Sequence, residues 1–203
     1  MRTPGVDFAL CCASLLALCL AACGGQTVEP LDPRDATLPP ETRHWIADAQ
    51  DGVIVARAQR DTMTAQLREV EQWRDRMLEV KWSGGRSAEV SKGIAGLAAA
   101  RIAVAEAELS YTAQFVRFAE AKHRLANAER AMLHDLAVYD LKPLRDAAAD
   151  AKQAMGKASD ETDRQKTEVD KATEAFWVAY AAHASAGGQT LSFWASGGPD
   201  NTE

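Results

Sequence analysis

Cysteine is missing from nearly all of this chain. The four cysteines stand at positions 11, 12, 19 and 23 of 203 residues, and none follows. The sequence after residue 23 can therefore form no disulfide bond and offers no cysteine ligand to a metal ion. Its fold must be stabilised by the packing of apolar side chains.

An excess of positive charge is also missing. The 23 lysines and arginines are outnumbered by 29 aspartates and glutamates, which gives a formal net charge of −6. Binding to nucleic acid requires a concentrated basic surface, and docking to anionic lipid requires a basic cluster. The charge balance therefore argues against a nucleic-acid partner and against a membrane contact driven by charge.

Sequence signatures of catalysis and ligand binding are missing as well. No serine stands in a nucleophile-elbow sequence, and no glycine-rich loop follows a predicted strand. The pattern Glu-x-x-His, which supplies ligands to di-iron sites in four-helix bundles, occurs at Glu41/His44 and at Glu120/His123. Helical phase places both pairs mainly on outward faces. We therefore expect no enzyme activity, no cofactor, no metal and no small-molecule substrate.

The first 22 residues are typical of an export signal. A short segment with one arginine precedes an apolar run, residues 8–20, that is too short to span a bilayer core. The run ends in the sequence Leu20-Ala21-Ala22-Cys23. This string resembles the lipobox of bacterial lipoproteins, in which a leucine and two small residues precede the cysteine that becomes the first mature residue. An ordinary secretory signal or an uncleaved helix is the alternative.

The resemblance implies a diacylglycerol thioether on Cys23, cleavage before this residue and usually N-acylation. Acyl chains contribute about 0.8 kcal/mol per buried CH₂ group, so several of them hold a protein firmly at a bilayer. Residue 24 is Gly rather than Asp, and the sorting rule of enteric bacteria then favours the outer membrane. The resemblance thus implies a lipid-anchored protein of the bacterial outer membrane that faces the periplasm, with the lipid bilayer as one partner.

Residues 23–40 are expected to form an extended tether between this anchor and the fold, because they are rich in proline and glycine and show no apolar period. Residues 41–82 then carry apolar side chains at alternating steps of three and four, which is typical of one face of a bundle helix. Ser83-Gly84-Gly85 predicts the end of this helix. Ser87 is a candidate N-cap for the next one.

The strongest periodic pattern lies in residues 87–140, the second predicted helix. Large apolar residues recur there at every seventh position, and an alanine follows most of them after three residues. The large residues are Leu97, Val104, Tyr111, Phe118, Leu125, Met132 and Tyr139. A sustained seven-residue repeat indicates a supercoil. The alternation of large and small side chains suits tight antiparallel packing within one chain, or self-association.

The third predicted helix covers residues 144–184. Asp140 is a candidate cap and Pro143 is favourable in a first turn, so we expect a turn before this helix. A kink in one longer helix is the alternative. The inward positions of the third helix are mostly apolar, but residues 159–168 are nearly all polar and predict the most loosely packed part of the fold. A glycine-rich flexible tail is expected over residues 187–203.

Three helices joined by short breaks predict an all-α fold, an elongated antiparallel three-helix bundle or coiled coil over residues 41–186. The second helix is predicted to be the longest, so either its start around Gly93 and Gly96 is irregular or one end projects. The topology gathers aromatic residues at the end far from the tether, where they either complete the core or form a docking surface. The candidate docking residues are Trp82, Trp177 and Trp194.

These patterns favour a non-enzymatic envelope protein that acts as a structural or protein-interaction module. Its helix faces would bind a protein partner or a second copy of the chain. The alternative is an accessory subunit of an envelope assembly such as an efflux or secretion complex, because the heptad hairpin resembles those of periplasmic efflux adaptors and outer-membrane efflux ducts. The strand-rich domains that accompany adaptor hairpins have no counterpart in this sequence.

Overall fold

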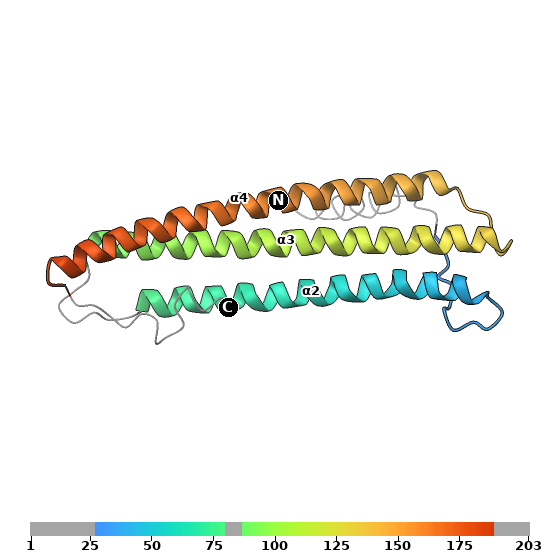
Figure 1. Cartoon of the computed structure of the whole chain (residues 1–203), viewed down its shortest axis with the longest axis horizontal. Helices are drawn as coiled ribbons and strands as arrows, with labels where there is room; N and C mark the ends of the chain where they lie inside the picture. Colours follow the sequence, from blue (N-terminus) through green and yellow to red (C-terminus); the bar gives the residue numbers. More distant parts are fainter. Residues whose placement is uncertain (1–26, 80–86, 189–203) are drawn as a thin grey trace, which may run out of the picture.

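The computed structural model describes residues 27–79 and 87–188. Within these ranges the chain forms three helices and no strand: α2 (Pro40–Glu79), α3 (Ala88–Leu133) and α4 (Leu141–Ser185). They run antiparallel, with α3 between the other two in an elongated rod (Figure 1). The predicted all-α class and three-helix bundle are confirmed. None of the helices in these ranges is long and apolar enough to cross a membrane.

α3 ends at Leu133, seven residues before the predicted end at 140 (140 − 133 = 7). A Schellman motif closes the helix: the Asp135 N–H donates to the carbonyl of Met132 (3.2 Å), and the Leu136 N–H donates to that of Ala131 (2.9 Å). Asp135 has a φ of 56°, a left-handed conformation that glycine favours and aspartate tolerates. Because no glycine marks this position, the sequence pattern alone does not predict the helix end.

α4 begins at Leu141, and Asp140 is its N-cap as predicted, with the carboxylate accepting from the Lys142 N–H at 3.0 Å. Pro143 therefore stands in the first turn of the helix, where its missing N–H costs no hydrogen bond. A turn, rather than a kink, separates α3 from α4. At the other end, Gly187 has a φ of 78° and closes α4 with a second Schellman motif.

α3 continues through Gly93 and Gly96, so the irregular start considered from the sequence is not observed. The three helices have 40, 46 and 45 residues, which corresponds to about 60, 69 and 68 Å. At Gly93, α3 comes close to α4: a Cβ atom there would lie 3.2 Å from the Cα of Phe176. At Gly96 an added Cβ would meet nothing within 4 Å.

Replacing Gly96 by alanine is expected to raise the free energy of unfolding by up to about 1 kcal/mol, because alanine favours the helix and restricts the unfolded chain. The matched change Gly93→Ala should raise the free energy of unfolding by less, because its Cβ atom would lie too close to the backbone of Phe176. Denaturant titration followed by circular dichroism compares the two variants. Equal gains would contradict the close approach of α3 and α4.

Residues 27–39 lie against the bundle, so this part of the predicted tether is not a free linker. The Leu31 N–H donates to Oδ1 of Asn127 (2.7 Å), a side chain fully buried in α3. The Glu29 N–H lies 3.4 Å from the Tyr139 hydroxyl. The segment therefore sits where α3 turns into α4 (Figure 1). We call this the proximal end of the rod and the opposite end the distal end.

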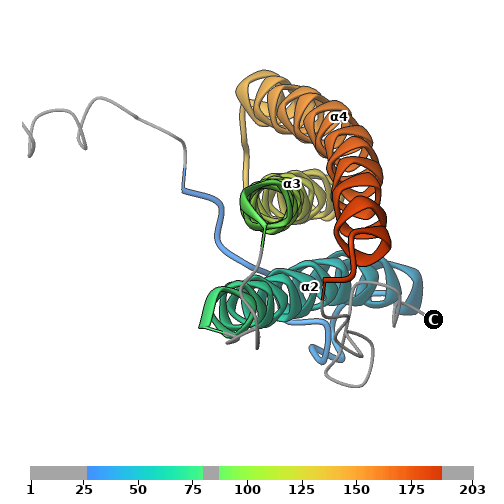
Figure 2. The same cartoon turned by 90° about the vertical axis from the view of Figure 1, so that its left-hand side faces the viewer.

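The backbones of both outer helices approach α3 closely but do not approach each other. No Cα atom of α2 lies within 8 Å of a Cα atom of α4, whereas both helices approach α3 this closely. Figure 2, viewed along the rod, shows α2 and α4 crossing α3 obliquely on different sides. The contacts of α3 are made mainly by small side chains. Its buried alanines are Ala98, Ala105, Ala107, Ala119, Ala121, Ala126, Ala128 and Ala131.

The large residues of the seven-residue repeat lie between two rows of these alanines on the surface of α3. Leu97 is fully buried. The residues of the repeat that stay half-buried in α3 are Val104, Tyr111, Phe118, Leu125 and Met132. Helical phase directs this stripe toward the gap between α2 and α4. The predicted alternation of large and small residues is therefore present, but the small residues make the tight helix contacts.

An apolar core at the distal end joins all three helices. Its buried side chains are Trp73 and Met77 of α2, Val90, Ile94, Leu97 and Ala98 of α3, and Phe176 of α4. A smaller core nearer the proximal end joins α2 to α3 through Val53, Ala56, Val116 and Ala119. Between these two cores, no residue of α2 from 57 to 72 is fully buried. The middle of the rod is therefore its most openly packed part.

Candidate partner-binding groove

A groove opens in the middle of the rod, between the two apolar cores. It has a volume of about 660 Å³ and is lined by all three helices. The lining residues are Val55, Ala58, Gln59, Thr62 and Met63 of α2, Glu108, Tyr111 and Thr112 of α3, and Ser159, Thr162, Asp163 and Lys166 of α4. We call this the mid-bundle groove.

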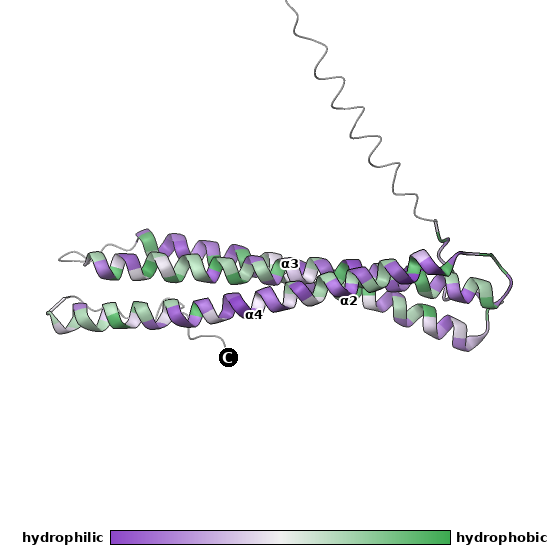
Figure 3. Cartoon of the chain, turned by 90° about the horizontal axis from the view of Figure 1, so that it is seen from above, coloured by the Kyte–Doolittle hydropathy of each residue, from purple (hydrophilic) through white to green (hydrophobic). Residues whose placement is uncertain are grey.

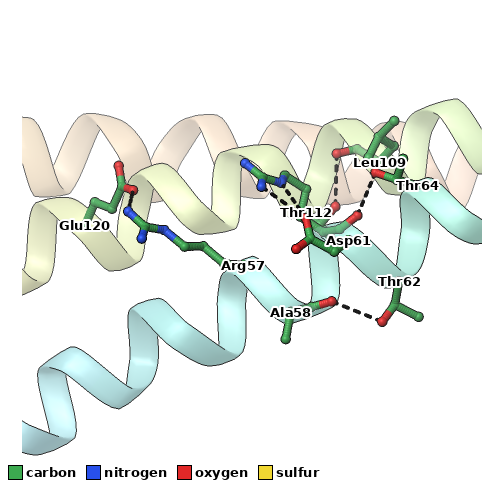
Figure 4. A network of polar contacts seen from close by, with 9 residues as sticks. Arg57, Ala58, Asp61, Thr62, Thr64, Leu109, Thr112 and Glu120 are labelled. Atoms are coloured by element: carbon green, nitrogen blue, oxygen red, sulfur yellow. Dashed lines mark hydrogen bonds and ion pairs between the residues drawn. The ribbon is translucent and has the colours of Figure 1, made fainter.

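The groove exists because inward positions at this level hold polar side chains. Arg60 continues the three-four spacing of the buried Val53 and Ala56 along α2 but is exposed. Thr112 and Thr162 are buried in α3 and α4, and each hydroxyl donates to a carbonyl of its own helix (Figure 4 shows Thr112). These hydroxyls bury little apolar surface, so they do not draw the outer helices together. The middle of α4 is correspondingly hydrophilic (Figure 3).

Charged side chains join the helices near the groove. Nη2 of Arg57 in α2 lies 2.7 Å from Oε1 of Glu120 in α3 (Figure 4). Nζ of Lys166 in α4 lies 3.4 Å from Oε1 of Glu108 in α3. All four side chains are partly open to water, so each pair contributes at most about 1 kcal/mol to stability. Because these ion pairs are weak, they do not fix the distance between α3 and either outer helix.

The inner surface of the groove is an apolar stripe bordered by charges. Tyr111 stacks on Phe115, with ring centroids 6.5 Å apart and an interplanar angle of 9°. Three α2 residues add apolar surface: Val55, Ala58 and Met63. The charged lining residues are Glu108, Asp163 and Lys166. An apolar stripe with charges of both signs at its edge suits the apolar face of an amphipathic helix.

The aromatic residues of the distal end belong mainly to its core. Trp73 and Phe176 are buried, and Trp177 packs beside them half-buried, with its ring centroid 5.3 Å from that of Phe176. Trp177 therefore contributes to the packing of the distal core, and its role as a docking residue stays a prediction. Trp82 and Trp194, the other two candidates, lie outside the described residues, as does Cys23.

The two Glu-x-x-His pairs lie on different helices and in different surroundings. Glu41 and His44 are exposed at the start of α2, whereas Glu120 pairs with Arg57. Partial burial lowers the pKa of His123 and so favours the neutral form of its imidazole. Among the residues described by the structure, no group of three or more His, Cys, Asp or Glu side chains is placed to hold a metal ion.

Two functional features are not predicted from the sequence. Val55 lies outside the inward apolar pattern of α2, so no period marks it as part of a groove. Asn127 interrupts the apolar surface of α3, and this interruption is the one clue to its contact with residues 27–39. For the groove itself the clues are Arg60 and the polar stretch 159–168, which remove apolar side chains at one level of the rod.

A scan against protein-family models and searches of the curated proteins and the solved structures found no match to this chain. Its function therefore has to be argued from its own residues.

Proposed function

We propose that this chain is a lipid-anchored protein of the bacterial outer membrane that faces the periplasm and binds a helical segment of a protein partner in the mid-bundle groove. The observation that carries the proposal is the groove, where a half-buried apolar stripe lies between two outer helices that do not meet. The sequence Leu20-Ala21-Ala22-Cys23, which resembles a lipobox, supports the proposed location.

An amphipathic helix is the occupant that the geometry favours. Tyr111 and Phe118 stand seven residues apart on α3, which corresponds to about two helical turns. A partner helix lying along α3 would insert its own apolar side chains between such residues, as helices do in a coiled coil. A second hollow of about 260 Å³, lined in part by Trp45 and Leu125, lies between α2 and α3 nearer the proximal end. It would extend the contact beyond the mid-bundle groove.

The anchor is tested by replacing Cys23 with serine, which has no thiol to form the thioether. We expect the mass of the attached diacylglycerol to disappear and the protein to be lost from the outer-membrane fraction. Cys19→Ser, a change in the apolar run that precedes the lipobox-like sequence, should preserve both. Mass spectrometry of the purified protein and fractionation of the membranes measure the outcome. An outer-membrane location kept by Cys23→Ser would refute the lipid anchor.

The groove is tested with Val55 and Ile54, which are neighbours on α2 and are 51% and 58% exposed. Only Val55 lines the groove. A photoreactive p-benzoylphenylalanine at position 55 should give a discrete cross-linked protein in living cells, whereas the same residue at position 54 should not. Val55→Asp should also weaken capture of that protein by about tenfold or more, because the carboxylate would have to be desolvated in the complex.

Two results would contradict this proposal. Equal cross-linking from positions 54 and 55 would mean that the groove is not the contact surface. Cross-links only between copies of this chain would mean that the groove serves self-association. Ile54→Asp controls for a general effect of negative charge on α2, and should leave capture unchanged.

An accessory subunit of an efflux or secretion assembly is the second candidate function. It is favoured by the α3–α4 hairpin, whose helices of 46 and 45 residues form long antiparallel arms. The protein cross-linked at position 55 separates the two candidates. A component of a trans-envelope assembly would support the accessory role, and a partner outside any such assembly would support an independent docking protein.

A further inference from the structure

We propose that the turn between α3 and α4 contacts the surface of the bilayer and seats the proximal end of the rod on the membrane. This inference rests on the lipid anchor at Cys23. The turn presents three apolar side chains to solvent: Leu133 is 62% exposed, Leu136 is 56% exposed and Val138 is 90% exposed. Apolar residues gathered on a tip in this way mark a contact surface.

The position of the chain near this turn identifies the bilayer as what the tip contacts. The Glu29 N–H lies 3.4 Å from the hydroxyl of Tyr139, the residue that follows Val138. Glu29 is six residues after Cys23 (29 − 23 = 6). An extended chain spans at most about 3.6 Å per residue, so this contact lies within about 22 Å of the acylated cysteine. The distal end is farther away by the length of a helix, about 68 Å.

The charges around the turn favour an apolar contact with neutral lipid. Asp135 and Asp140 are exposed on either side of Leu136 and Val138. The nearby Lys142 is engaged by Asp146, with Nζ and Oδ2 2.6 Å apart. Attraction to anionic headgroups needs a basic cluster, which this turn does not provide. Because the anchor keeps the turn near the bilayer, a few apolar side chains suffice for a stable contact.

Spin labelling tests this inference directly, because no cysteine follows Cys23 in the sequence. Val138→Cys would be labelled with a nitroxide in the full acylated protein, reconstituted in vesicles of phosphatidylcholine and phosphatidylethanolamine. Val178→Cys, an exposed valine near the distal end of α4, is the matched control. We expect the ratio of oxygen to nickel-complex collisions to be at least about threefold higher at position 138, because the bilayer concentrates oxygen and excludes the nickel complex. High salt should leave this ratio unchanged.

Three outcomes would contradict the proposed contact between the α3–α4 turn and the bilayer. The first is a label at position 138 that is as accessible to the nickel complex as the label at position 178. The second is loss of the difference in high salt, which would indicate a contact driven by charge. The third is dipolar broadening between labels at position 138, which would indicate that a second copy covers the tip. Leu136→Cys repeats the measurement at a neighbouring position and guards against a local effect of the first substitution.

Mass spectrometry of the same sample distinguishes failure of this inference from failure of the proposed function. An unmodified Cys23 would contradict both the proposed lipid anchor and the proposed contact of the turn with the bilayer. An acylated Cys23 with a water-exposed label at position 138 would contradict only the contact of the turn with the bilayer.

Discussion

Phe176→Ala is expected to lower the free energy of unfolding by about 3–5 kcal/mol, the usual cost of removing a fully buried aromatic ring. Phe176 is 1% exposed and is the one fully buried α4 residue of the distal core. Loss of the ring would leave a cavity beside Trp73 and Ile94, because the helix backbones meet closely at Gly93 and cannot fill it. Denaturant titration followed by circular dichroism measures the change.

Val178→Ala is the matched control for Phe176→Ala, because it removes an apolar side chain two residues farther along the same helix. Val178 is 66% exposed, so its replacement should change stability by less than about 0.5 kcal/mol. If Phe176→Ala lowered the free energy of unfolding by less than about 1 kcal/mol, the distal core would not depend on packing around this ring.

Asn127→Ala is expected to cost about 1–3 kcal/mol, because it removes the acceptor of a buried hydrogen bond and leaves the donor without a partner. The Asn127 side chain accepts from the Leu31 N–H at 2.7 Å and donates to the His123 carbonyl at 2.8 Å. Its loss should also release residues 27–39 from the proximal end. Trypsin cleavage after the exposed Arg34 should therefore become faster, and denaturant titration should show the lower stability.

Gln114→Ala is the control for Asn127→Ala. Gln114 is a half-buried amide on the same helix, and its Oε1 accepts a hydrogen bond from Nη1 of Arg117 on that helix (3.4 Å). This change should leave both stability and cleavage after Arg34 nearly unaltered. If Asn127→Ala lowered stability without faster cleavage, Asn127 would act through packing within α3 and not by holding the N-terminal segment.

Much of the fold can be predicted from the sequence because apolar period and helix caps are local. The inward pattern of α4 predicts its buried residues Ala148, Thr162 and Phe176, and Asp140 predicts its cap. The end of α3 cannot be predicted in this way, because Asp135 adopts a conformation that sequence reasoning reserves for glycine. Proline-rich composition likewise predicts an extended segment but cannot reveal that residues 27–39 find a partner in Asn127.

The candidate groove is only partly predictable, because it depends on how three helices are spaced. The polar stretch 159–168 predicts loose packing, and the structure places the groove beside it. The seven-residue repeat suggests that Tyr111 and Phe118 fill the core. They remain half-buried, whereas the alanines next to them on α3 are fully buried. Period shows which residues share a face, but it does not show whether a neighbour covers that face.

The separation of α2 from α4 has a consequence for cooperativity. Every close helix contact involves α3 and a helix next to it along the chain, so the native contacts are largely local and folding should be rapid. Away from the distal core, either outer helix can open while the other stays packed on α3. A helix bound in the mid-bundle groove would contact both outer helices at once. With such a helix bound, α2 and α4 would no longer open independently, and the bundle would open as one cooperative unit.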